Sequence, residues 1–129
     1  HPFKDVILSK NWDFRLWDVI EKARYAKQPE AQKAIGTYFY GPKMEWQFLD
    51  RYFSSNNLHD KTGLEIDLSS VKTIQTKENV GTYEYKKASH PLFGSVVKGV
   101  PKRYFRGASK VSDLGYSDHF PIRVKLRVK

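Results

Sequence analysis

The sequence predicts a mixed α/β (α+β) fold. Three features predict it: apolar residues at helical spacing near the start, aromatic runs bounded by Gly and Pro in the middle, and strict alternation at the end. The chain has 129 residues, of which 40% are hydrophobic and 15% aromatic. A chain of this length and composition can bury a core of its own. We therefore expect one compact unit that contains both helices and strands.

A helix is expected over residues 11–28. Its apolar residues recur at spacings near three and four, which is typical of an amphipathic helix; they are Phe14, Leu16, Trp17, Ile20, Ala23 and Ala26. Asn11 or Asp13 would cap the amino end, and Pro29 would end the pattern or start a second turn. A short second helix is expected over 30–35, before a glycine.

Strands are expected after this helical region. Residues 37–40 and 45–54 are rich in aromatic strand formers and flank a Gly-Pro turn signal. Alternation along 45–54 would place Asp50 on the same face as three aromatic side chains. Because a carboxylate there must find a partner to offset its desolvation, we expect a cationic or donating group beside Asp50. Another strand is expected over 64–74.

The last third of the chain reads as loops followed by one strand. Residues 77–115 are expected to form mainly long loops, with a short helix possible near 91–97. Residues 120–128 alternate apolar and polar side chains throughout, which predicts a strand. The tripeptide Ser117, Asp118 and His119 lies directly before it, where a rigid support can hold catalytic residues.

The net charge of +9 predicts attraction to polyanions, although a merely solvated basic surface is an equal explanation. Cysteine is absent, which excludes disulfides and thiolate metal sites. A basic loop carries aromatic residues and could steer a phosphate-bearing substrate, with Lys102, Arg103 and Arg106 as the main candidates among Lys98, Lys102, Arg103, Tyr104, Phe105, Arg106 and Lys110. A solvated loop whose aromatics pack on the core is the alternative reading. No run of residues is long and apolar enough to span a bilayer.

Two segments resemble motifs of the endonuclease/exonuclease/phosphatase superfamily, whose members have the deoxyribonuclease-I-like fold. Residues 46–55 (WQFLDRYFSS) are similar to the family strand of aromatic, Leu or Ile, Asp, aromatic, apolar and Ser residues. Residues 115–122 (GYSDHFPI) are similar to its closing Ser-Asp-His-aromatic-Pro-aliphatic motif. Residues 36–40 (GTYFY) also resemble a Gly-Thr-aromatic element of some bacterial members.

The resemblance implies that residues 1–129 are the carboxy-terminal half of such a domain, truncated just after the family's Gly-Asp-Phe-Asn-Asp strand end. The family fold is a four-layer α/β/β/α sandwich, and this half would supply one mainly antiparallel sheet with a flanking helix. The missing amino-terminal half would then be a partner. Without it, the apolar sheet face around positions such as Trp46, Phe48 and Ile122 would be exposed, so we expect self-association or partial disorder.

The resemblance also implies a metal-dependent phosphoesterase that acts on phosphodiester or phosphomonoester bonds, nucleic acid among them. His119 would take a proton from the attacking water, and Asp50 would orient and support its imidazolium. Asp118 would face the metal or the phosphate. The metal would be one divalent ion, most often magnesium, whose main ligands lie outside this chain, so we expect the chain alone to be inactive.

Two other functions remain open at this point. The chain could be a basic module that binds nucleic acid without catalysis, or a catalytically silent interaction domain. Only the phosphoesterase hypothesis requires Asp50 and His119 to lie within hydrogen-bonding distance. The choice of substrate among nucleic acids, lipid headgroups and small phosphate esters is not decided by the sequence, and neither is the compartment.

Overall fold

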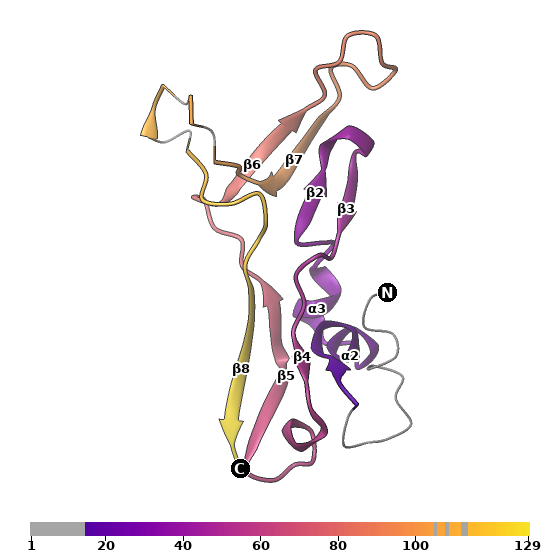
Figure 1. Cartoon of the computed structure of the whole chain (residues 1–129), viewed down its shortest axis with the longest axis vertical. Coiled ribbons are helices and arrows are strands. Elements are labelled where there is room, and N and C mark those ends of the chain that lie inside the picture. Colours follow the sequence, from indigo (N-terminus) through magenta and orange to yellow (C-terminus); the bar gives the residue numbers. More distant parts are fainter. Residues whose placement is uncertain (1–14, 105, 108, 112–113) are drawn as a thin grey trace. The chain divides into compact units, whose positions relative to one another are not determined.

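The computed structural model describes residues 15–104, 106–107, 109–111 and 114–129. Within these residues the fold is mixed α+β, with two α-helices, two 3-10 turns and eight short strands (Figure 1). The helices are α2 (Val19–Tyr25) and α3 (Pro29–Lys33), and the 3-10 turns are η1 (Gly41–Lys43) and η2 (Asn56–Leu58). The strands are β1 (Trp17–Asp18), β2 (Tyr38–Tyr40), β3 (Glu45–Gln47), β4 (Phe53–Ser54), β5 (Leu64–Thr73), β6 (Val80–Glu84), β7 (Val96–Pro101) and β8 (Ile122–Val128).

The described strands form four antiparallel pairs: β1 with β4, β2 with β3, β5 with β8, and β6 with β7. The described residues divide into two compact units. The first contains residues 15–34, 51–73 and 122–129, and the second contains residues 35–50 and 74–121. None of the helices in the described part of the chain is long and apolar enough to cross a membrane.

In the first unit, α2 begins later than the sequence predicts. Trp17 and Asp18 pair with β4 as an extended strand, and the Asp18 carboxylate then accepts hydrogen bonds from the backbone N–H groups of Ile20 and Glu21. An Asp that satisfies two of the unpaired N–H groups of a first turn fixes the helix start at the next residue. The expected caps Asn11 and Asp13 lie outside the described residues. A short second helix was expected over 30–35; α3 starts at Pro29, which is one of the two roles expected for this proline.

The pair of β5 and β8 is the longest ladder of the first unit (Figure 1). Both strands were predicted from their apolar patterns, and the structure confirms them. Helices α2 and α3 both pack against β5. Ile66 and Val71 of that strand are buried, together with Val19, Ile20 and Ala23 of α2. The apolar face of a short helix therefore covers one side of this ladder.

In the second unit, aromatic side chains make the core. Phe39 of β2 is buried, and its ring lies 5.3 Å from that of Trp46 and 5.5 Å from that of Tyr83 in edge-on contacts. Trp46 stacks on the buried Phe120 at 6.1 Å. Edge-on and offset stacked pairs of this kind add to the free energy gained from burial. Trp46, Phe48 and Ile122, expected on an uncovered sheet face, are each partly covered.

The expected strand over 45–54 is interrupted. Regular pairing ends at Gln47, and β4 resumes only at Phe53. The backbone N–H groups of Leu49 and Asp50 instead donate to the Thr37 hydroxyl, which takes these residues out of a ladder. The predicted alternation of faces therefore does not extend to Asp50.

The expectation of loops over 77–115 is wrong in part, because β6 and β7 form an antiparallel hairpin there. The expected helix near 91–97 is absent: residues 91–94 form turns in the hairpin loop, and β7 begins at Val96. Gly81 interrupts the apolar pattern of β6, and Lys98 and Gly99 interrupt that of β7; an irregularity between Gly81 and Thr82 also breaks their register. Pairing between the two strands stabilises them here, although the local sequence pattern of each strand does not predict it.

Candidate active site

The site is built around Thr37, which is fully buried in the second unit. Its hydroxyl oxygen accepts hydrogen bonds from the N–H groups of Leu49 and Asp50, each at 3.2 Å. Its backbone carbonyl accepts the N–H of Phe120 at 2.7 Å, and its own N–H donates to the Gln47 carbonyl at 2.9 Å. One residue thus fixes the backbone of the segment that carries Asp50 and that of the segment that carries His119.

Asp50 and His119 meet directly. The Nδ1 atom of His119 lies 2.6 Å from Oδ2 of Asp50, although the two residues are 69 positions apart. Asp50 was expected to need a donating partner, and this contact supplies it. The expected reason for such a partner was burial of the carboxylate among aromatic side chains. The Asp50 side chain is instead 39% exposed. The His119 side chain is 30% exposed.

The contact defines the chemistry of the imidazole. A neutral ring has one N–H and one lone pair, so Nδ1 must carry the proton to donate to the Asp50 carboxylate. The lone pair is then on Nε2. The backbone N–H of His119 donates to the Ser117 hydroxyl at 3.1 Å, which tightens the turn before the ring. The arrangement can therefore accept a proton at Nε2 and stabilise the resulting imidazolium from the opposite side.

Asp118 lies on the Nε2 side of the ring. Its Oδ1 is 4.0 Å from Nε2 of His119, and its side chain is 54% exposed. Among the described residues, no three His, Cys, Asp or Glu side chains come close enough together to hold a metal ion. A magnesium ion takes several oxygen ligands, and one carboxylate is a small part of such a set.

Tyr38 was not among the residues selected from the sequence. Its ring lies 4.9 Å from the His119 ring in a tilted contact, and its backbone forms an isolated antiparallel bridge with His119. The Arg103 guanidinium lies 5.6 Å from the centre of the same ring, and Arg103 Nη2 donates to the Phe39 carbonyl at 2.8 Å. Tyr38 thus contacts both the candidate base and one of the predicted phosphate-binding residues.

The other predicted substrate-binding residues are less closely placed. Lys102 and Arg103 both line a hollow in the second unit, whereas Arg106 is exposed in a turn. Tyr104 is also exposed, and Phe105 lies outside the described residues. Of the three predicted cations, Arg103 is therefore the one that the structure connects to His119 through a shared neighbour.

A second histidine pair lies in the first unit. Ser54, the Ser that follows the predicted Asp motif, is buried, and its hydroxyl lies 2.7 Å from Nε2 of His59. Burial and the positive charge of Lys22 lower the pKa of His59, and Glu65 opposes this in part. A ring held neutral in this way accepts or donates a hydrogen bond to Ser54 without charge.

Thr37 and Tyr38 could have been suspected from the resemblance of residues 36–40 to a family element, but not from the pattern of hydrophobicity.

Comparisons of the chain with protein-family models, curated proteins and solved structures found no match.

Proposed function

We propose that this chain carries the general-base pair of a metal-dependent phosphoric ester hydrolase of the endonuclease/exonuclease/phosphatase superfamily. The observation that carries the proposal is the 2.6 Å contact between His119 Nδ1 and Asp50 Oδ2. It joins two segments that were selected separately for their resemblance to motifs of the same family. A basic binding module and a silent interaction domain have no need of this contact.

In the proposed reaction, Nε2 of His119 removes a proton from a water molecule as the water oxygen bonds to phosphorus. The bond between phosphorus and the alcohol oxygen breaks, the leaving oxygen takes up a proton from solvent, and the imidazolium of His119 returns its proton to solvent. The Asp50 carboxylate keeps Nδ1 protonated throughout and stabilises the imidazolium that forms. A positioned base of this kind contributes about 10²- to 10⁴-fold to a rate.

The proposal extends to the four-layer sandwich and to magnesium, both of which the family resemblance implies. Asp118 is the carboxylate on the Nε2 side of the ring and would be the contribution of this segment to the metal or phosphate. Among the described residues, no three His, Cys, Asp or Glu side chains form a group that could hold the metal. The remaining ligands would come from residues outside the described part of the chain.

The test is hydrolysis of bis-p-nitrophenyl phosphate and p-nitrophenyl phosphate by the longest natural polypeptide that contains this chain, with magnesium present. His119→Gln should lower kcat at least about 100-fold, and Asp50→Ala should lower it about 10-fold or more. His90→Gln is the matched control, because His90 lies in the hairpin loop and should leave kcat unchanged. Equal activity of the His119→Gln variant and the unmodified protein would refute the assignment.

A second arm uses the 129-residue chain alone. It should hydrolyse neither substrate, since a single carboxylate does not hold magnesium in place. Magnesium-dependent turnover by the chain would show that the metal ligands are not missing, and would overturn that part of the proposal. The role of His119 as the base would still be tested by the His119→Gln variant.

A further inference from the structure

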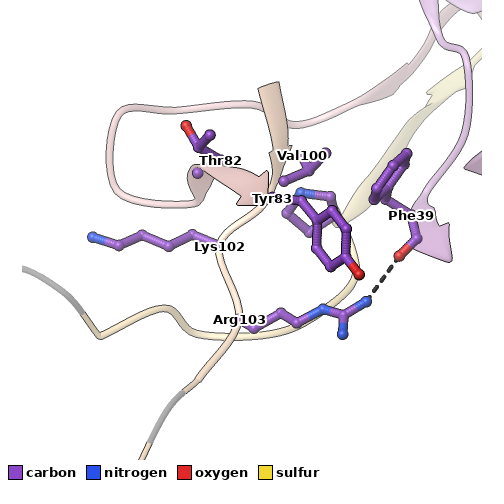
Figure 2. A pocket seen from close by; sticks show the side chains of 8 residues that line it. Phe39, Thr82, Tyr83, Val100, Lys102 and Arg103 are labelled. Atoms are coloured by element: carbon purple, nitrogen blue, oxygen red, sulfur yellow. Dashed lines mark hydrogen bonds between the residues drawn. The ribbon is translucent and has the colours of Figure 1, made fainter. Parts of the chain in front are cut away.

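The hollow in the second unit has a volume of about 310 Å³ (Figure 2). Its walls come from β2, from the facing parts of β6 and β7, and from the two residues after β7. The side chains used below are Phe39, Thr82, Tyr83, Val100, Lys102 and Arg103. A volume of this size is at the lower end of ligand-binding pockets, which suits a small molecule or one unit of a larger one.

A β-bulge shapes one wall. Gly81 pairs with Val100 and Thr82 pairs with Lys98, so Gly99 is an extra residue on β7. Gly99 has a φ of +81°, a left-handed conformation that glycine adopts without strain. Bulges bend a strand and redirect the residues that follow. Lys102 and Arg103 follow directly after β7, and both line the hollow.

The chemistry of the walls combines flat rings with positive charge. Tyr83 packs edge-on against Phe39, and Gly41 leaves room for its ring, because a Cβ at position 41 would lie 2.3 Å from Tyr83. Lys102 and Arg103 are the charged residues at the hollow, and no carboxylate is among the described residues that line it. An anionic ligand with a flat or apolar part fits such walls better than a neutral polyol does.

The Arg103 guanidinium is positioned by one hydrogen bond and has further N–H donors that could bind a ligand. Figure 2 shows its guanidinium below the Tyr83 ring, with one nitrogen bonded to the Phe39 carbonyl at 2.8 Å. A guanidinium has five N–H donors in a planar fork. That carbonyl is its one hydrogen-bond acceptor among the described residues, so an anion can bind the others. Arg and phosphate oxygens form charge-assisted, two-pronged hydrogen bonds.

The hollow is connected to the candidate base through Tyr38. The Arg103 guanidinium and the His119 ring both contact the Tyr38 ring, at 5.6 Å and 4.9 Å from its centre. Tyr38 is therefore a shared neighbour of the residue that would bind the phosphate and of the candidate base.

We infer that this hollow binds the ring of a phosphate ester whose alcohol carries a flat ring, such as an aryl phosphate or a nucleoside phosphate, while Arg103 binds the phosphate. The inference rests on the proposed function for the identity of the bond that is cleaved. Ligand binding itself is a property of the hollow and does not require hydrolysis.

The experiment is an NMR titration of the ¹⁵N-labelled chain with phenyl phosphate, adenosine 5′-monophosphate, glycerol 2-phosphate and inorganic phosphate. Phenyl phosphate or the nucleotide should bind at least about fivefold more tightly than glycerol 2-phosphate, because the ring gains contact with Tyr83. The largest shifts should fall on the amides of Thr82, Tyr83, Val100 and Arg103. Tighter binding of phenyl phosphate would indicate a simple aryl ester as the ligand. Tighter binding of adenosine 5′-monophosphate would indicate a nucleoside ester.

Variants separate the two kinds of contact. Arg103→Gln should weaken every phosphate compound about tenfold or more, since it removes charge-assisted hydrogen bonds. Arg123→Gln on β8 makes the same change of net charge at a residue that does not line the hollow, and should weaken binding less than twofold. Tyr83→Leu should remove the preference for rings, and Tyr83→Phe should keep it. If Tyr83→Leu fails to fold, the ligand series and the arginine pair still decide the matter.

Equal affinity for phenyl phosphate and glycerol 2-phosphate, shifts that map outside the hollow, or equal effects of the two arginine variants would overturn the inference. The two proposals fail separately. If hydrolysis by the longer polypeptide depends on His119 but rings do not bind here, only the ring site is wrong. If rings bind but hydrolysis is independent of His119, only the base assignment is wrong.

Discussion

At the scale of single residues, Thr37 positions the two segments that carry Asp50 and His119. Its hydroxyl accepts two backbone N–H groups from the Asp50 segment, while the carbonyl of the same residue accepts the N–H of Phe120, next to His119. A buried acceptor shared in this way cannot be replaced by water without opening the structure. Thr37 is therefore a positioning residue: its hydrogen bonds hold the backbone on both sides of the contact between Asp50 and His119.

Thr37→Val should lower the free energy of unfolding by about 1–3 kcal/mol, because two N–H groups lose their acceptor while the shape of the side chain is kept. Thr37→Ser keeps the hydroxyl and removes one buried methyl group. It should therefore lower the free energy of unfolding by only about 1 kcal/mol. Urea unfolding of both variants measures the difference. Equal destabilisation by Val and Ser would show that packing, not the hydroxyl, is what matters at this position.

His59 predicts a pH dependence of stability. Its folded-state pKa is lowered by burial and by Lys22, below the ordinary histidine value of 6.5. As the pH falls through that value, the unfolded chain binds a proton that the folded chain does not, so the free energy of unfolding decreases. The stability is fully present above about pH 6.5 and is lost as the pH falls below it.

The measurement is the urea midpoint at pH 7.5 and pH 5.5. It should fall in the unmodified chain and fall less in His59→Gln, which cannot take up the proton. The carboxylates whose pKa values are also lowered, such as Glu65 and Asp67, titrate below this window and do not confuse it. An unchanged pH dependence in His59→Gln would contradict the assignment.

At the scale of elements, the sequence predicts what local pattern determines. The strands β5 and β8 follow from alternation alone, and a short helix close to α3 was expected from the sequence. The hairpin of β6 and β7 was missed because its pairing is fixed across residues 80–101 and contains a bulge at Gly99, which breaks the alternation. The interruption after Gln47 was missed for a related reason: a side chain twelve residues earlier, Thr37, captures the N–H groups.

The candidate site divides in the same way. Asp50, Asp118 and His119 were named from motifs, and the structure brings Asp50 and His119 together. Tyr38 and Thr37 were not named, because their roles depend on contacts between segments distant in sequence. Hydrophobic periodicity reports which face of an element is buried, and carries no information on which polar group a backbone N–H will find.

Gly115 holds the segment of Ser117, Asp118 and His119 against the end of β7. A Cβ at this position would lie 1.5 Å from the carbonyl oxygen of Lys102, and the Gly115 N–H donates to the Arg103 carbonyl at 3.2 Å. Gly115→Ala must therefore move backbone away from backbone, which should lower the free energy of unfolding by about 2 kcal/mol or more.

Amide hydrogen exchange should show the consequence as faster exchange at Phe120, whose N–H is bonded to Thr37. Tyr116→Ala, next in the chain and 78% exposed, is the control and should change neither quantity. Loss of stability without faster exchange at Phe120 would show that Gly115 does not support the segment that carries His119.

At the scale of the whole molecule, a net charge of +9 coexists with exposed apolar side chains. Leu64 and Val128 face each other across the β5–β8 ladder and are 45% and 83% exposed, and Leu126 is 51% exposed. Because residues paired across a ladder point to the same side, these three lie on the side that also carries the buried Ile66, and they leave part of that side apolar and exposed. We propose that this face drives self-association of the chain.

Leu126→Lys should reduce self-association, measured as the weight-average sedimentation coefficient over a range of concentrations. Gln75→Lys adds the same charge at an exposed residue outside β8 and should have a smaller effect. Salt screens charge repulsion over about 10 Å at 0.1 M, so both should be compared at one ionic strength. If the unmodified chain is monomeric at every concentration, the face has no such role.

The central claim is that Asp50 fixes the tautomer of His119 so that Nε2 can act as a base. Imidazole ¹⁵N shifts of the neutral ring test it directly, and the chain contains its own reference: His90 Nδ1 accepts the N–H of Leu92 at 3.1 Å, so His90 must carry its proton on Nε2. We predict the opposite tautomer for His119, with the proton on Nδ1, and loss of that preference in Asp50→Ala. A His119 ring protonated on Nε2, or one indifferent to Asp50→Ala, would contradict the account.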